Sequence, residues 1–74
     1  MSFQAYLDNI ERKTGKPPED FKQLAAQKGY LRDGKLRSEV KAGEVVAWLK
    51  KDFGLGHGHS MAIVALLRGK QSDK

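Results

Sequence analysis

The sequence predicts an all-α fold, a compact bundle of four short helices in which the carboxy-terminal helix is central and buried. Three observations support this fold class. Apolar residues recur at the 3.6-residue period of a helix in four separate stretches. Glycine or proline separates each stretch from the next. The last stretch, residues 61–67, is apolar on every face, which is typical of a buried helix.

The first two predicted helices are defined by their ends. The first ends at Gly15, where a left-handed residue would close it, and Ser2 is its expected N-cap. The second begins at Pro18, because proline at the first helical position loses no needed hydrogen bond, and it ends at Gly29. Tyr30 is expected to pack back onto this helix. The apolar stripes are Phe3, Tyr6, Leu7 and Ile10 in the first helix and Phe21, Leu24 and Ala25 in the second.

Residues 30–41 connect the second helix to the third. Asp33 and Gly34 predict a turn, since both residue types tolerate positive φ. A small hairpin is possible, but two strands short enough to fit here would be marginally stable. We therefore interpret the segment as an irregular connection, with Leu31 and Leu36 pointing inward.

The third predicted helix begins between Ser38 and Gly43 and ends at Phe53, before Gly54. Its apolar stripe places most of its large side chains in the core. Trp48 flanks that stripe, and among the aromatic residues it is the one we expect to be partly exposed for a partner.

Length and composition limit the chain to one small domain. Of the 74 residues, 39% are hydrophobic and 31% charged, and cysteine is absent, so neither disulfides nor thiolate metal sites contribute. The net charge of +5 permits binding to nucleic acid or an anionic surface without establishing it. We expect one helical domain over residues 1–69 and a disordered polar tail over residues 70–74.

Secretion and membrane insertion find no support in the sequence. The first residues lack a basic stretch followed by an apolar one. The longest apolar run, residues 61–67, is far shorter than the roughly 20 residues that cross a bilayer. We therefore expect a cytoplasmic protein with no membrane partner.

Residues 54–59, with the sequence Gly-Leu-Gly-His-Gly-His, precede the fourth helix, which we expect to begin within residues 58–60 and end before Gly69. One interpretation is structural: glycines at positive φ make a tight interhelical loop, and Gly56 is expected to be one of them. The other is functional: glycines let an anion approach the backbone, and the N–H groups that open a helix carry partial positive charge. The candidate anion-binding residues are Gly54, Leu55, Gly56, His57, Gly58 and His59.

This loop resembles the helix-hairpin-helix DNA-binding motif. The motif joins two helices through a Gly-hydrophobic-Gly loop, which Gly54-Leu55-Gly56 matches, and Ala62-Ile63 matches the small-aliphatic pair of its second helix. The resemblance covers residues 46–67. It implies that loop amides contact a DNA phosphate, which gives binding independent of sequence. The basic side chains that would add charge are Lys50, Lys51 and Arg68.

Metal binding and catalysis are not predicted. His57 and His59 are two residues apart, so on a helix they face different sides, and cysteine or carboxylate ligands do not accompany them. The carboxylates are scattered over solvent-facing positions, and Ser60 has no evident third group to orient a nucleophile and base. We expect no metal, no cofactor and no enzymatic activity.

Four segments together resemble a known family: residues 3–7, 14–21, 45–50 and the Gly-Leu-Gly-His-Gly-His stretch at 54–59. The family is small, bacterial and known only as domain of unknown function 4287. The resemblance spans nearly all of residues 2–68 and implies a small helical domain. It implies no activity, and no catalytic or binding residues transfer with it.

Two functions remain open at this point. The chain is either a nucleic-acid-binding module acting through residues 54–59, or a protein-interaction module with an exposed face around Trp48 or residues 30–41. Salt distinguishes them, because phosphate contacts weaken steeply as salt rises whereas an apolar interface is much less sensitive.

Overall fold

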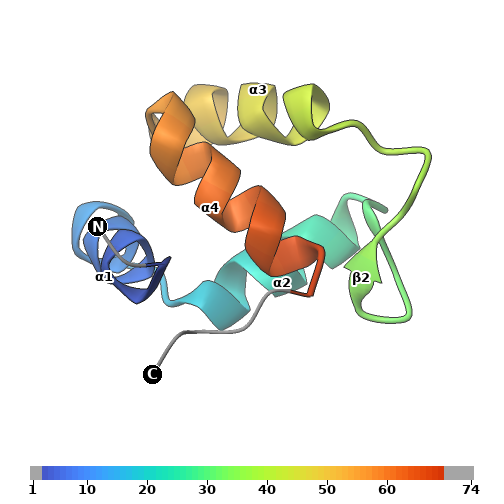
Figure 1. Ribbon diagram of the computed structural model, residues 1–74, viewed down its shortest axis with the longest axis horizontal. Coiled ribbons are helices and arrows are strands. Elements are labelled where there is room, and N and C mark those ends of the chain that lie inside the picture. Colours follow the sequence, from blue (N-terminus) through green and yellow to red (C-terminus); the bar gives the residue numbers. More distant parts are fainter. Residues whose placement is uncertain (1–2, 70–74) are drawn as a thin grey trace.

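The computed structural model describes residues 3–69; the predicted Ser2 N-cap and the predicted tail over residues 70–74 lie outside them. The described chain forms four helices and one short hairpin, as Figure 1 shows. The elements are α1 (Phe3–Thr14), α2 (Pro18–Gln27), β1 (Leu31–Arg32), β2 (Lys35–Leu36), α3 (Ala42–Phe53) and α4 (His57–Leu67).

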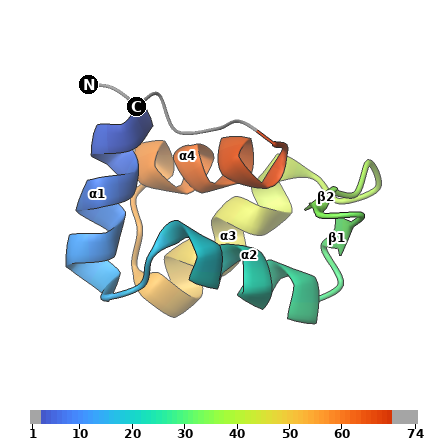
Figure 2. The same ribbon diagram turned by 90° about the horizontal axis from the view of Figure 1, so that it is seen from below.

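Helix α4 is the central element, as the sequence predicts. It packs against α3, α1, α2 and β2. In Figure 1 it crosses the middle of the molecule between α3 and α2, and Figure 2 shows α1 beside its amino-terminal half. Six of its eleven residues are buried: Ser60, Ala62, Ile63, Val64, Leu66 and Leu67.

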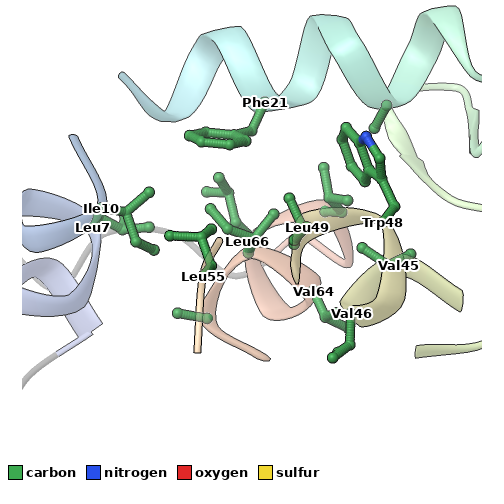
Figure 3. Packing of buried hydrophobic residues seen from close by; sticks show 14 of the residues in the cluster. Leu7, Ile10, Phe21, Val45, Val46, Trp48, Leu49, Leu55, Val64 and Leu66 are labelled. Carbon is green, nitrogen blue, oxygen red and sulfur yellow. The ribbon is translucent and has the colours of Figure 1, made fainter. Parts of the chain in front are cut away.

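The hydrophobic core collects one apolar stripe from each of the other helices around α4. Figure 3 shows Leu7 and Ile10 from α1, Phe21 from α2 and Leu49 from α3 directed toward the same interior. The side chains of Phe21, Leu49 and Ile63 have 0% exposure. Because each helix has its own buried stripe, every helix contributes to the burial that stabilises this small domain.

The end of α2 has the hydrogen bonds of a Schellman motif. Gly29 has φ 81° and donates its N–H to the Ala26 carbonyl at 3.0 Å, while Tyr30 donates its N–H to the Ala25 carbonyl at 3.0 Å. Helix α2 also begins at Pro18, and α1 is followed by Gly15 at φ 75°. The punctuation that the sequence predicts for α1 and α2 is therefore confirmed.

Residues 30–41 are more regular than the predicted irregular connection. Strands β1 and β2 pair antiparallel with Leu31 opposite Leu36, and both leucines are half-buried against the core. Asp33 and Gly34 have φ 54° and 79°, the two positive values that a type I′ turn needs. The expected turn and the inward leucines are present, but the interpretation as an irregular connection was wrong, because the turn geometry and the packing of both leucines on the core stabilise two strands of only two residues each.

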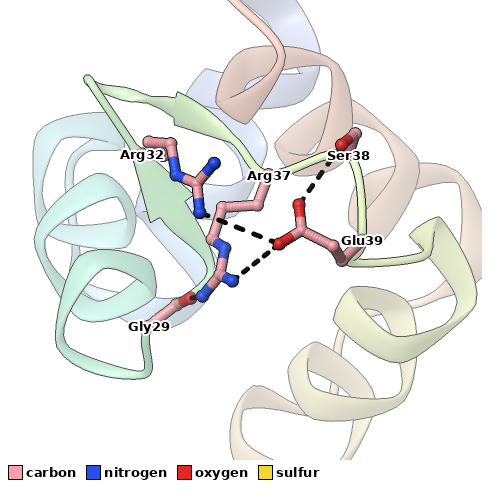
Figure 4. A network of polar contacts seen from close by, with 5 residues as sticks. All are labelled: Gly29, Arg32, Arg37, Ser38 and Glu39. Carbon is pink, nitrogen blue, oxygen red and sulfur yellow. Dashed lines mark hydrogen bonds and ion pairs between the residues drawn. The ribbon is translucent and has the colours of Figure 1, made fainter.

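A polar network fixes the chain after the hairpin to the end of α2, as Figure 4 shows. The Arg37 guanidinium donates to the Gly29 carbonyl at 3.2 Å and to the Glu39 carboxylate at 2.7 Å. Arg32 lies 3.9 Å from the same carboxylate, and the Ser38 hydroxyl donates to it at 3.2 Å. The hydrogen bond from Arg37 lowers the pKa of Glu39 from 4.5 to about 2, and the positive charge of Arg37 adds to the effect.

Candidate functional site

The loop between α3 and α4 is closed by one left-handed glycine. Gly54 has φ 66° and donates its N–H to the Lys50 carbonyl at 3.0 Å. Leu55 donates its N–H to the Leu49 carbonyl at 3.4 Å, and its side chain is 2% exposed in the core. The loop is therefore anchored by backbone hydrogen bonds on the α3 side and by a buried leucine at its centre.

On the α4 side the loop leaves backbone N–H groups open. Gly56 is the N-cap, with φ −70° and ψ 171°, and no side chain caps the helix. The first N–H bonded back to the cap is that of Ser60, which donates to the Gly56 carbonyl at 2.9 Å. The N–H groups of residues 57–59 precede it in the first turn and have no acceptor within the helix. These donors and the helix dipole make this end electropositive, and of the three residues His57 and Gly58 are exposed.

The expected positive φ at Gly56 is wrong, because only Gly54 in this loop adopts it. The extended Gly56 backbone suits any residue. A Cβ atom on Gly56 would meet nothing within 4 Å, and one on Gly58 would meet only Tyr6, at an ordinary 3.8 Å. Neither conformation nor packing therefore requires glycine at positions 56 and 58, and the missing side chains leave the first turn of α4 uncovered.

The structure brings two of the three predicted basic residues near the loop. Lys50 and Lys51 are exposed in the last turn of α3, and the exposed Asp52 lies between them and Gly54. Arg68 follows the opposite end of α4, roughly 16 Å along the helix axis from His57 at 1.5 Å per residue. Arg68 therefore cannot share a single phosphate with the loop.

The two histidines differ in their surroundings. His57 is exposed, whereas His59 is half-buried and its ring meets the Tyr6 ring edge-on, with centroids 5.3 Å apart. Within residues 3–69, no group of three or more histidine, aspartate or glutamate side chains could hold a metal ion. The aromatic contact gives His59 a structural role that sequence spacing does not reveal.

A groove between α1 and α4 lies beside this turn. Its volume is 420 Å³, and it is open to solvent on one side. The sequence did not predict this groove, because the helical spacing of Phe3 and Tyr6 assigned both side chains to the core. The sequence did carry a signal for it. Small residues at positions 58, 62 and 65 lie on one face of the fourth helix, so that face has short side chains while most of the rest of the helix has larger ones. The groove is lined by Phe3, Tyr6, His57, Gly58, Met61, Ala62 and Ala65.

Comparison with known families decides the classification of the chain. Residues 2–69 match the family described as a domain of unknown function, DUF4287. The chain belongs to the DUF4287 family. The match confirms the resemblance seen in the sequence, and it spans all four helices and the glycine-rich loop of this DUF4287 domain. Searches among curated proteins and among solved structures each found no match.

Other side chains of this DUF4287 domain cover Trp48. Trp48 is 8% exposed, so the prediction of a partly exposed tryptophan is wrong. The Tyr30 ring meets it edge-on at 5.7 Å between centroids, the Phe53 ring does so at 5.9 Å, and the Lys28 ammonium lies 5.5 Å from its centroid. Tyr30 reaches this position because the Schellman ending of α2 turns the chain back toward α3, a tertiary effect absent from the helical period.

None of the described helices is both long and apolar enough to cross a membrane.

Proposed function

We propose that this DUF4287 domain is a nucleic-acid-binding module that holds backbone phosphate at the first turn of α4. The observation that carries the proposal is the start of α4 at Gly56, where no side chain caps the helix, no acidic residue stands in the first turn, and a Cβ on Gly56 or Gly58 would meet no close contact. Open N–H groups at the positive end of a helix dipole suit phosphate. Contacts of this kind recognise the backbone and not the base sequence.

Charge around the loop supports the same function. Lys50 and Lys51 are exposed in the last turn of α3 and outnumber the one exposed carboxylate beside them, that of Asp52, and the first turn of α4 carries no acidic side chain. His57 is exposed beside the same turn, and its imidazole can donate a hydrogen bond to an anion. By contrast, Arg32 and Arg37, which follow α2, are less available to bind phosphate because both pair with Glu39.

The test is a salt-dependent titration with duplex and single-stranded DNA. Binding through phosphate should weaken linearly on a log–log plot against salt, and Lys50→Gln or Lys51→Gln should each reduce that slope by roughly 1. Lys41→Gln is the matched control, because it removes the same charge from an exposed lysine at the other end of α3. DNA affinity that does not change with salt concentration, or an equal reduction of the slope in all three variants, would contradict a phosphate site at the loop.

The alternative function is docking of another protein without nucleic acid. An apolar interface would bind with little dependence on salt. Its first predicted location is not available, since Trp48 is buried. The hairpin, its second, offers mainly exposed polar side chains, including those of Arg32 and Lys35. We therefore favour the nucleic-acid function.

A further inference from the structure

The groove between α1 and α4 has the features of a small-molecule site, and phosphate binding alone does not use it. We infer that it binds a free amphiphilic anion, with an apolar body lying between the two helices and a carboxylate head group at the His57 end. A volume of 420 Å³ falls within the ~300–1,000 Å³ typical of ligand pockets.

The walls of the groove favour a ligand with an apolar body. Phe3 and Ala62 are buried within it, while Tyr6, Met61 and Ala65 are only half-buried and leave apolar surface facing the opening. An apolar body placed there would remove that surface from water, which favours binding in proportion to the area covered.

The His57 end of the groove favours an anionic head group. His57 and Gly58 line that end, and the Tyr6 hydroxyl lies 4.0 Å from where a Cβ on Gly58 would stand. The lining residues include no aspartate or glutamate, and none stands in the first turn of α4. The polar groups there are a hydroxyl and an imidazole, each of which can donate a hydrogen bond to a carboxylate, and the positive end of a helix dipole, which favours an anion over a cation.

Part of this inference rests on the proposed function, because phosphate and the carboxylate head would meet the same first turn of α4. The apolar part rests on the groove alone. The two ligands should therefore compete at the head-group end, while only the amphiphile should perturb Phe3 and Ala65, which line the groove outside the first turn of α4.

The experiment compares hexanoate, butanoate, 1-hexanol and inorganic phosphate by their effects on backbone amide and methyl resonances. Hexanoate should shift the methyl groups of Met61 and Ala65 together with the amides of residues 57–59. It should bind up to about tenfold more tightly than butanoate, because two further methylenes are buried. It should bind roughly tenfold more tightly than 1-hexanol, which lacks the charge.

Two variants test the groove by different routes. Ala65→Phe fills it, and Met61→Gln keeps the side-chain length but makes the wall polar. Each should weaken hexanoate at least about tenfold while leaving the phosphate response unchanged. Ala47→Phe is the matched control for the added ring, because Ala47 is exposed on α3 and does not line the groove. Native-like amide spectra of the variants establish that they fold.

The outcomes separate this inference from the proposed function. Hexanoate that leaves the methyl groups of Met61 and Ala65 unmoved, or binds no better than 1-hexanol, overturns the inference even if phosphate and DNA bind. Hexanoate that binds with the expected preferences supports it even if DNA does not bind, in which case only the nucleic-acid function is overturned.

Discussion

The two ends of helix α4 differ in how their backbone groups are paired. Carbonyl groups at the carboxy-terminal end accept hydrogen bonds from the residues that follow, whereas no side chain caps the amino-terminal end. At the first, Arg68 donates its N–H to the Val64 carbonyl and Gly69 donates to the Leu66 carbonyl, both at 3.0 Å. The Lys35 side chain covers this end, with its Cε 3.4 Å from where a Cβ on Gly69 would stand. A lysine there also complements the negative end of the helix dipole.

The amino-terminal end has no comparable groups. Gly56 supplies no side-chain cap, Gly58 occupies the second helical position, and the first turn carries no acidic residue. Helix α2 shows the usual alternative, because it begins with Pro18 and places Glu19 and Asp20 in its first turn. Helices α2 and α3 also lack a side-chain cap, but each has an acidic residue in its first turn, whereas α4 has none. An anion bound at the start of α4 would supply the negative charge that its own side chains do not.

The largest expected effect is at the buried part of α4. Leu66→Ala removes a side chain that is 6% exposed and should lower the free energy of unfolding by roughly 2–5 kcal/mol. Small domains have only about 5–15 kcal/mol in total, so the variant should be close to unfolding. Urea denaturation measures the change. A loss below about 1 kcal/mol would contradict a central role for α4.

The next largest effect separates two glycines of the same loop. Gly54→Ala places a side chain at φ 66° and should cost about 1–2 kcal/mol. Gly58→Ala should instead stabilise the domain by up to about 1 kcal/mol, because the position is helical and a Cβ there meets only an ordinary contact. Urea denaturation of both variants gives the two signs. If both variants destabilise equally, Gly58 has a folding role after all.

Ser60 extends the comparison into the second turn of α4. Its hydroxyl is fully buried and has no hydrogen-bond partner among the described residues. A buried polar group without a partner costs stability, so Ser60→Ala should leave the free energy of unfolding unchanged or raise it by about 1 kcal/mol. Thermal unfolding checks this. A clear destabilisation would mean that the hydroxyl has a partner in solution, such as a water molecule.

The smallest expected effect lies in the network beside the hairpin. The folded pKa of Glu39 is about 2, below its ordinary 4.5, so its carboxylate contributes stability above pH 4.5 that is lost as pH falls toward 2. Glu39→Gln should therefore be less stable than the wild type at pH 7, and the difference should close near pH 2. The effect is small because the carboxylate is exposed. Urea denaturation across this pH range would contradict the account if the difference stayed constant.

The sequence predicted the helices well because three carry a periodic apolar stripe, the fourth is apolar on every face, and glycine or proline marks their ends, as at Pro18, Gly29 and Gly54. It predicted the hairpin and Trp48 wrongly, because both depend on contacts between distant segments. Leu31 and Leu36 need the core for support, and Trp48 is covered by Tyr30 from another element. Local pattern carries no information on such contacts.

The sequence predicted the glycine-rich loop before α4 but not the backbone conformation of that loop. The alternating glycines located the open start of α4, whereas the expected positive φ at Gly56 belongs to Gly54 alone. The groove was missed because Tyr6 and Met61 have the spacing of core residues, and only the packing of α1 on α4 leaves them half-exposed.

The most direct test of the account is a titration of the domain with inorganic phosphate at low salt and pH 6, followed by backbone amide shifts. If the first turn of α4 binds phosphate, the amides of residues 54–61 should move first. Gly56→Val should abolish the response by covering the turn, while keeping a native-like spectrum because φ −70° accommodates valine. Amides of residues 54–61 that stay unmoved in the wild-type domain would contradict the proposed function.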